Sequence, residues 1–208
     1  MSLPSSFYSR PTLEVTEELI GKVLVHDVRG RRTAGIIVEV EAYIGESDPV
    51  CHAAPGPTKR NAPLYGPPGR AYVYFNYGMH YLVNAVTEGE GSPAAVLIRA
   101  LEPMQGIEVM QRRRRTAKDL RDLCRGPGNL TKALGIDLRQ NRADLTTSRL
   151  TIEDHGITPK RLTWSPRIGI RVGTEHEWRC CWAGHPSVSG RVGSTSEGRS
   201  TSRLRRPR

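Results

Sequence analysis

Two carboxylates and a phenol ring lie close together in residues 34–45, at a spacing that is suited to chemistry. Side chains alternate along a β-strand, so Glu39, Glu41 and Tyr43 are predicted to share one face. A carboxylate held in an apolar strand can take a proton from water, and a ring two residues away offers a stacking surface. The pattern predicts a general base at Glu41 beside an aromatic wall. The alternative is a strand whose acidic face is simply solvated.

Arg99 interrupts residues 94–101, which are otherwise apolar. A guanidinium in such a strand needs an acceptor, and a carboxylate is its best partner. We therefore expect Arg99 and Glu41 to flank one water molecule. A structural ion pair, or an arginine that reaches solvent at the strand end, is the alternative.

A second group of residues is suited to holding a flat, nitrogen-rich ring. Tyr43 and Tyr74 can sandwich it, because stacking of a base on an aromatic side chain is worth roughly 1–3 kcal/mol. Asn84 has two donors and one acceptor for the edge of a base, and His52 adds a further hydrogen bond. The alternative for each of these residues is a place in the core or a structural role.

Other residues are suited to contacts with a nucleic-acid backbone and base stack. Tyr77 and Met79 occupy a predicted hairpin tip, where a protruding apolar side chain suits insertion between bases. Gly128 lies in the first turn of a predicted helix, whose free N–H groups can bind a phosphate. Four consecutive loop residues offer a hydroxyl, two cations and an amide for another phosphate. They are Thr58, Lys59, Arg60 and Asn61.

The charge of the chain agrees with such a partner. The 208 residues include 31 Lys and Arg against 21 Asp and Glu, a net charge of +10. This surplus favours a polyanion, because basic side chains displace the counterions condensed on phosphates. Residues 191–208 hold six arginines and one glutamate, which is +5 of that surplus, and almost no apolar residue. We expect this basic tail to be disordered.

Other function classes lack their signatures. The four cysteines show neither disulfide nor zinc spacing, so no metal site is expected. No dinucleotide fingerprint, P-loop, secretion signal or membrane-spanning run is present. We expect an intracellular protein without a cofactor.

The order of elements predicts one α+β domain over residues 1–190, with a curved, mostly antiparallel sheet and short helices. Helices are predicted over residues 12–20, 103–115 and 127–134. Strands are predicted over residues 22–28, 34–45, 71–77, 80–86, 94–101, 149–153, 166–172 and 179–183. Residues 45–70 form a long Pro- and Gly-rich loop, and a loop of this length in a compact domain is usually functional or disordered; we expect it to be functional.

Taken together, these segments resemble the alkyladenine (3-methyladenine) DNA glycosylase family of the mammalian type. The matching motifs are EVEAY at 39–43, TKRN at 58–61, GPPGRAYVY at 66–74, YGMH at 77–80, LIRALEP at 97–103 and RGPGNL at 125–130. Their order and spacing agree from about residue 7 to residue 190. The segment 178–186 departs from the family pattern, with Cys180 and Cys181 where bulkier aromatic residues are usual.

The resemblance implies a fold similar to the C-terminal domain of methionyl-tRNA formyltransferase, and catalysis without metal or cofactor. The implied roles are activation of water by Glu41 with Arg99, base binding by Tyr43, His52, Tyr74 and Asn84, and filling of the gap in the duplex by Tyr77. The implied reaction is monofunctional removal of alkylated or deaminated purines, such as 3-methyladenine, 7-methylguanine and hypoxanthine, from double-stranded DNA by a monomer.

Three alternatives stay open. A bifunctional enzyme would cleave the strand through a lysine imine, but the predicted pocket strands contain no lysine. A non-catalytic nucleic-acid binder explains the charge and the tyrosines, but not an acid facing a phosphate-binding surface. A formyltransferase-like enzyme or RNA-binding appendage rests on fold analogy alone.

Overall fold

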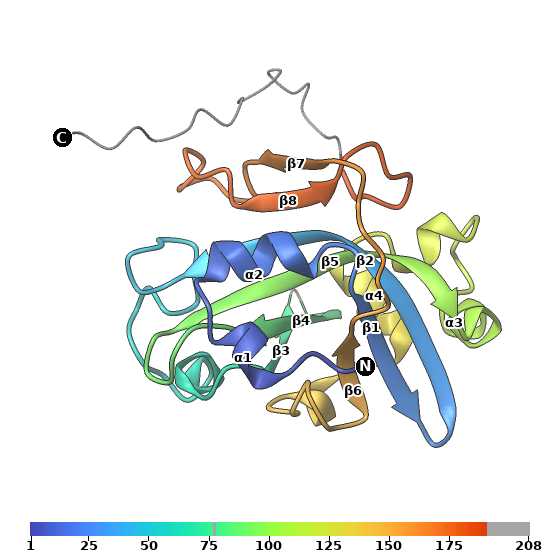
Figure 1. Cartoon of the computed structure of the whole chain (residues 1–208), viewed down its shortest axis with the longest axis horizontal. Helices are drawn as coiled ribbons and strands as arrows, with labels where there is room; N and C mark the ends of the chain where they lie inside the picture. The colour runs from blue at the N-terminus through green and yellow to red at the C-terminus, as the bar shows by residue number, and fades with distance from the viewer. Residues whose placement is uncertain (77, 191–208) are drawn as a thin grey trace.

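A curled antiparallel sheet organises the chain (Figure 1). The computed structural model describes residues 1–76 and 78–190, so Tyr77 and the basic tail lie outside the described residues. The strands are β1 (Val23–Val28), β2 (Arg31–Ile44), β3 (Ala71–Asn76), β4 (His80–Val86), β5 (Ala94–Gln105), β6 (Leu150–Glu153), β7 (Leu162–Ser165) and β8 (Arg179–Trp182). The helices are α1 (Ser5–Tyr8), α2 (Thr12–Leu19), α3 (Ile107–Arg113) and α4 (Pro127–Leu134), with 3-10 turns η1 (Ala62–Tyr65), η2 (Arg121–Cys124) and η3 (Leu138–Gln140).

The long strand β2 is the centre of the sheet. The strand order is β3-β4-β5-β2-β1-β6, and β8 pairs with both β2 and β7. β2 pairs with β5 along one edge, and with β1 and then β8 along the other. All of these pairs are antiparallel, which confirms the predicted α+β class with a curved sheet. Glu41 is therefore held between neighbours on both sides, Leu97 in β5 and Arg179 in β8.

Two compensating bulges lie in the middle of the β2–β5 pair. The paired residues are Ile37 with Leu101, Glu39 with Ala100, and Val40 with Ile98. Val38 in β2 and Arg99 in β5 are thus the extra residues. A bulge re-aims side chains and is frequent beside functional sites. The strict alternation predicted along β2 fails here, because Ile37 packs in the same cluster as Val40.

The main core lies between the sheet and the helices. Figure 1 shows α2 lying across β2 and β5. This helix buries Val15 and Leu19. The helix α4 buries Leu130 and Leu134 in the same cluster. This helix begins at a proline and ends before Gly135, which adopts a left-handed φ of 73°. Both boundaries agree with the prediction, because proline suits a first turn and glycine a left-handed cap.

Two predicted elements differ from the structure. The helix expected over residues 103–115 is shorter, because β5 continues to Gln105 before α3 begins at Ile107. The strand expected over residues 166–172 is wrong, since this segment is a loop and β7 ends at Ser165. Ile168 and Ile170 alternate as in a strand, but Gly169 between them has a φ of 80°. Among the described residues, no helix has the length and apolar character needed to cross a membrane.

Candidate active site

Glu41 is completely buried in β2 and accepts three hydrogen bonds. Its Oε2 accepts from Arg99 Nη1 at 3.1 Å and from the Tyr43 hydroxyl at 3.0 Å. Its Oε1 accepts from the backbone N–H of Ile168 at 2.7 Å. A carboxylate has about four acceptor positions, so one position is left for a further donor such as water. Burial raises the pKa of Glu41, against the opposing charge of Arg99.

Glu39 is the second acceptor for the same guanidinium. Arg99 Nε donates to Glu39 Oε1 at 3.0 Å, so Arg99 bridges the two carboxylates and does not bind Glu41 through two bonds. Arg179 Nε also donates to Glu39, at 2.8 Å, and so do the N–H and hydroxyl of Ser189, at 2.6 and 3.0 Å. Two arginines and a serine thus hold Glu39 in place, and Glu39 fixes Arg99.

A cavity of about 550 Å³ lies against this pair. Its aromatic and polar lining comes from β2, the following loop, β3, β4 and β5. These residues are Tyr43, His52, Tyr72, Tyr74, Asn76, Asn84 and Arg99. The loop 168–171, which was predicted to be a strand, closes another side. Glu41 lies directly behind this wall, because Tyr43, Arg99 and Ile168 all line the cavity and all bind the Glu41 carboxylate.

The predicted base-binding residues meet in the cavity. His52 Nδ1 lies 2.9 Å from the Tyr72 hydroxyl, and its ring meets that of Tyr74 edge-on, with 4.5 Å between centroids. Burial lowers the pKa of His52, which favours the neutral ring at neutral pH. The side-chain N–H of Asn84 donates to the Tyr72 carbonyl at 3.0 Å, which leaves the Asn84 oxygen without a partner among the described residues. Size and lining suit a flat polar ring.

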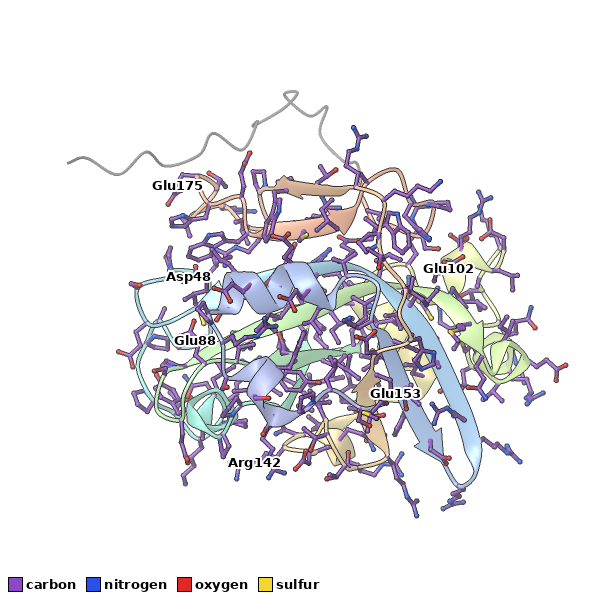
Figure 2. All side chains as sticks on the ribbon, in the orientation of Figure 1. Asp48, Glu88, Glu102, Arg142, Glu153 and Glu175 are labelled. Atoms are coloured by element: carbon purple, nitrogen blue, oxygen red, sulfur yellow. The ribbon has the colours of Figure 1, made fainter. Side chains whose placement is uncertain are left out.

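Arg167 is a buried site residue that the sequence pattern did not reveal. Its guanidinium lies between the rings of Tyr43 and Trp178, 4.7 and 5.0 Å from their centroids. It donates to both carboxylate oxygens of Asp48, at 2.6 and 2.8 Å, and to the Ala42 carbonyl at 3.0 Å. Figure 2 labels Asp48 on the side where the loop after β2 runs. Arg167 therefore fixes the Tyr43 ring and the start of that loop.

The predicted phosphate contacts fall into two groups. Lys59 and Arg60 are exposed on the loop, together with Thr58. Asn61 is buried, and its amide holds the loop by bonding to the N–H of Thr58 and to the carbonyls of His52 and Gly56. Its side chain is thus occupied within the loop. Arg60, although exposed, donates to the Phe75 carbonyl at 3.4 Å and lies 5.8 Å from the centroid of the Tyr74 ring.

Two further predicted DNA contacts lie on neighbouring elements. Gly128 in α4 packs against His80, where an added Cβ would come within 2.6 Å of the ring. Only glycine lets the helix approach β4 this closely. Met79 is 69% exposed at the β3–β4 turn, while Tyr77, two residues earlier in the sequence, lies outside the described residues. The hairpin tip therefore presents an apolar side chain to solvent.

Comparison with known proteins decides the family. The methylpurine-DNA glycosylase family model matches residues 6–186. The chain belongs to the methylpurine-DNA glycosylase family. This membership confirms the predicted family and makes the chain a DNA glycosylase of base excision repair, a hydrolase that acts on DNA.

Several relatives of this glycosylase are named "Putative 3-methyladenine DNA glycosylase". The protein of Chlorobaculum tepidum is 48% identical over 189 residues, covering 90% of each chain. The proteins of Burkholderia lata and Methanocella arvoryzae are each 47% identical, over 193 and 194 residues. These matches cover 91% of this chain, and 92% and 96% of the relatives.

Cys180 and Cys181, which were expected to depart from the family pattern, are packing residues. Cys180 is fully buried in the main core, and Cys181 is buried with Val38 and Val188. Burial raises the pKa of Cys181 to about 12. Neither lines the cavity. The cavity wall is thus built without the two sulfur atoms.

Proposed function

We propose that this glycosylase removes alkylated or deaminated purines from double-stranded DNA by hydrolysis of the N-glycosidic bond, and that it acts as a monomer on the nucleoid. The observation that carries the proposal is a buried carboxylate with one spare acceptor position, bridged by Arg99 behind the wall of a cavity lined by tyrosines. The purines we assign to it are 3-methyladenine, 7-methylguanine and hypoxanthine.

The damaged nucleotide must first leave the duplex, at a cost of a few kcal/mol. Tyr77 and Met79 at the hairpin tip offset part of this cost by filling the gap in the base stack. Lys59 and Arg60, with Thr58, hold the neighbouring phosphates, and the N–H of Gly128 in the first turn of α4 donates to another. Asn61 shapes this loop instead of contacting DNA.

The extruded base then stacks between Tyr43 and Tyr74. Each stacking contact is worth roughly 1–3 kcal/mol, with a further gain when the base is cationic. His52 and the free oxygen of Asn84 address the edge of the base. We assign to Asn84 discrimination against undamaged guanine through its exocyclic amino group. 7-Methylguanine carries the same group, but its positive charge makes it a better leaving base.

Hydrolysis follows with Glu41 as general base. A water in the spare acceptor position gives its proton to Glu41, and its oxygen bonds to C1′ while the C1′–N bond breaks. The electron pair of that bond leaves with the base. A cationic alkylpurine becomes neutral in this way, whereas hypoxanthine, which starts neutral, takes up a proton from solvent as it leaves. The negative carboxylate also favours the positive charge that develops on the sugar. The products are a free base and an abasic site.

Monofunctional chemistry agrees with the lining of the cavity. Among the described residues that line it there is no lysine, so no amine is placed to form an imine with C1′. Borohydride reduction during turnover is therefore expected to trap no protein on DNA. A trapped adduct would contradict the monofunctional mechanism.

The decisive test is release of free purines from duplexes that carry each of the three lesions. Glu41→Gln keeps the size of the side chain but cannot accept the proton, so we expect release to fall by at least the roughly 10²–10⁴-fold typical of a general base. Binding to lesion DNA is expected to persist. Glu90→Gln, at an exposed loop carboxylate, is the matched control. Turnover by Glu41→Gln at the wild-type rate would refute the assignment.

A further inference from the structure

A second cavity, of about 330 Å³, shares no lining residue with the first. It lies where the end of β1, the C-terminal end of α4 and the turn η3 meet the segment 148–150. Neither the family nor the proposed reaction assigns a role to this place. Its chemistry is set by one buried histidine and by the arginines around it.

His26 is that histidine, and one of its ring nitrogens has no partner. The residue is 2% exposed, and its Nδ1 lies 2.9 Å from the carbonyl oxygen of Leu134. A carbonyl only accepts, so Nδ1 carries the proton. Burial lowers the pKa of His26, which keeps the ring neutral and leaves a lone pair on Nε2. Within residues 1–76 and 78–190 no donor reaches Nε2, although the ring lines the cavity.

The surroundings of His26 carry a surplus of positive charge. The lining guanidinium groups are those of Arg29, Arg139 and Arg149. Arg113 of α3 adds a fourth, close enough to lower the pKa of His26 by its charge. The opposing carboxylates are Asp137, which pairs with Arg139, and Asp27, which accepts from the N–H of Gly30. Four cations against two anions leave an excess of two positive charges.

These features suit a ligand that is anionic and also has a proton to donate. A carboxylate at neutral pH has charge but no proton, and a phosphodiester or sulfate has none either. Hydrogen phosphate has both, and so does the singly protonated form of a phosphate monoester, which is the minor form near neutral pH because the second pKa is close to 6. Arginine is well suited to the remaining oxygens.

We propose that this cavity is a binding site for a protonated phosphate group, whose P–OH donates to His26 Nε2 while Arg29 and Arg149 bind its charged oxygens. The group can belong to free phosphate or to the terminal phosphate of a DNA strand. The internal phosphodiesters of a duplex are the wrong ligand, which separates this site from the loop at Lys59.

The test uses the full chain and follows the His26 ring by NMR while inorganic phosphate is added at pH 6.5 and constant ionic strength. We expect a saturable shift of the His26 resonance. Arg29→Gln and Arg149→Gln each leave the His26 ring in place as the reporter. Each is expected to weaken the binding of phosphate at least tenfold. Arg121→Gln, an exposed arginine outside the cavity, is the matched control and should leave binding unchanged. No saturable shift, or an equal response to sulfate, would overturn the proposal.

A second arm identifies the source of the phosphate. If a 5′-phosphorylated oligonucleotide displaces inorganic phosphate and its 5′-hydroxyl counterpart does not, the ligand is a strand end. If neither displaces it, the ligand is free phosphate. Both results support the proposed phosphate site. Displacement by the 5′-hydroxyl form would show that the cavity binds internal phosphodiesters, and this would contradict the proposal. Purine release is measured in parallel, so a failure of the proposed reaction is seen separately.

Discussion

Glu39 and Glu41 are only two residues apart and share one arginine, but their surroundings suit them to different tasks. Four donors surround Glu39, two of them from arginines, so it serves as a fixed anchor for Arg99. Glu41 has three donors and one spare acceptor position, and it lies behind the cavity wall. Two carboxylates in unlike environments often divide into a spectator and a participant. The geometry therefore favours Glu41 as the base and Glu39 as its support.

The pH dependence of release tests this division. Only ionised Glu41 accepts a proton, and its folded-state pKa lies above the ordinary value of 4.5 because of burial. Release of 7-methylguanine in single turnover is therefore expected to fall as the pH drops, with a midpoint above 4.5. His52→Gln should show the same fall in release at low pH, because this fall reflects protonation of Glu41. A midpoint at or below 4.5 would contradict a buried base.

Arg167 gives a second prediction for a single residue. Arg167→Lys keeps the charge but loses the planar fork, so it loses the paired bonds to Asp48 and the stack between Tyr43 and Trp178. Breaking a buried pair costs roughly 3–5 kcal/mol, and we expect a lysine to lose about half of that. The melting temperature should fall by several degrees, and lesion binding should weaken as Tyr43 loosens.

Arg171→Lys is the matched control for this change. Arg171 also lines the cavity but is exposed, so its replacement should leave the melting temperature unchanged. If Arg167→Lys and Arg171→Lys melt at the same temperature, Arg167 does not anchor the wall.

Among the elements, the loop between β2 and β3 depends on a few buried side chains. Asp48 ties its start to Arg167, and Asn61 ties its far part to three backbone groups. Tyr65 adds a bond to Glu46 at 2.8 Å. Such side-chain bonds replace the strand ladder that an irregular segment lacks. The loop is thereby held as one wall of the cavity, with Lys59 and Arg60 exposed on it.

Two substitutions in this loop distinguish the side chain that holds the loop structure from one that supplies charge for DNA binding. Asn61→Ala leaves three partly buried backbone groups without partners. The full cost for a buried group is roughly 1–3 kcal/mol, so we expect a lower melting temperature and faster proteolysis within residues 45–66. Lys59→Gln should leave both unchanged and weaken binding to undamaged duplex. It should also reduce the slope of log K against log salt by about one. A stable Asn61→Ala protein would mean that the loop is held by other contacts.

At the scale of the whole molecule, the tail beyond Gly190 carries much of the positive charge of the chain. It can be removed without loss of a contact to the site only if the truncation begins after Gly190. It contributes +5 of the net +10. Ser189, just before it, donates two hydrogen bonds to Glu39, so a truncation must leave Ser189 and Gly190 in place. A shorter protein would lose an anchor of Arg99.

Removal of residues 191–208 is expected to weaken binding to undamaged duplex and to make the salt dependence less steep, because fewer counterions are released. The rate of release in single turnover at saturating enzyme should stay the same. The measurement is log K against log salt for the full and the truncated chain. Equal slopes would show that the tail contacts no phosphate.

Much of the fold was readable from local patterns. The limits of α4 follow from Pro127 and Gly135, and the strands β3 and β4 match the predicted ranges 71–77 and 80–86 to within one residue. The segment around Ile168 was misread, because periodicity cannot show that a glycine with positive φ breaks the strand. The two bulges at Val38 and Arg99 were equally hidden, since register belongs to a pair of strands and not to one.

The sequence by itself determined the types of group at the site and their shared face, as with Glu39 and Glu41, because alternation along a strand is a local property. It also determined the family, through short motifs in a constant order. Only the tertiary structure decided that the N–H of Ile168 meets Glu41 across 127 residues, and that Arg167 meets Asp48 across 119. Contacts at such separations depend on how the sheet curls and where β8 joins it, and no local pattern contains that information.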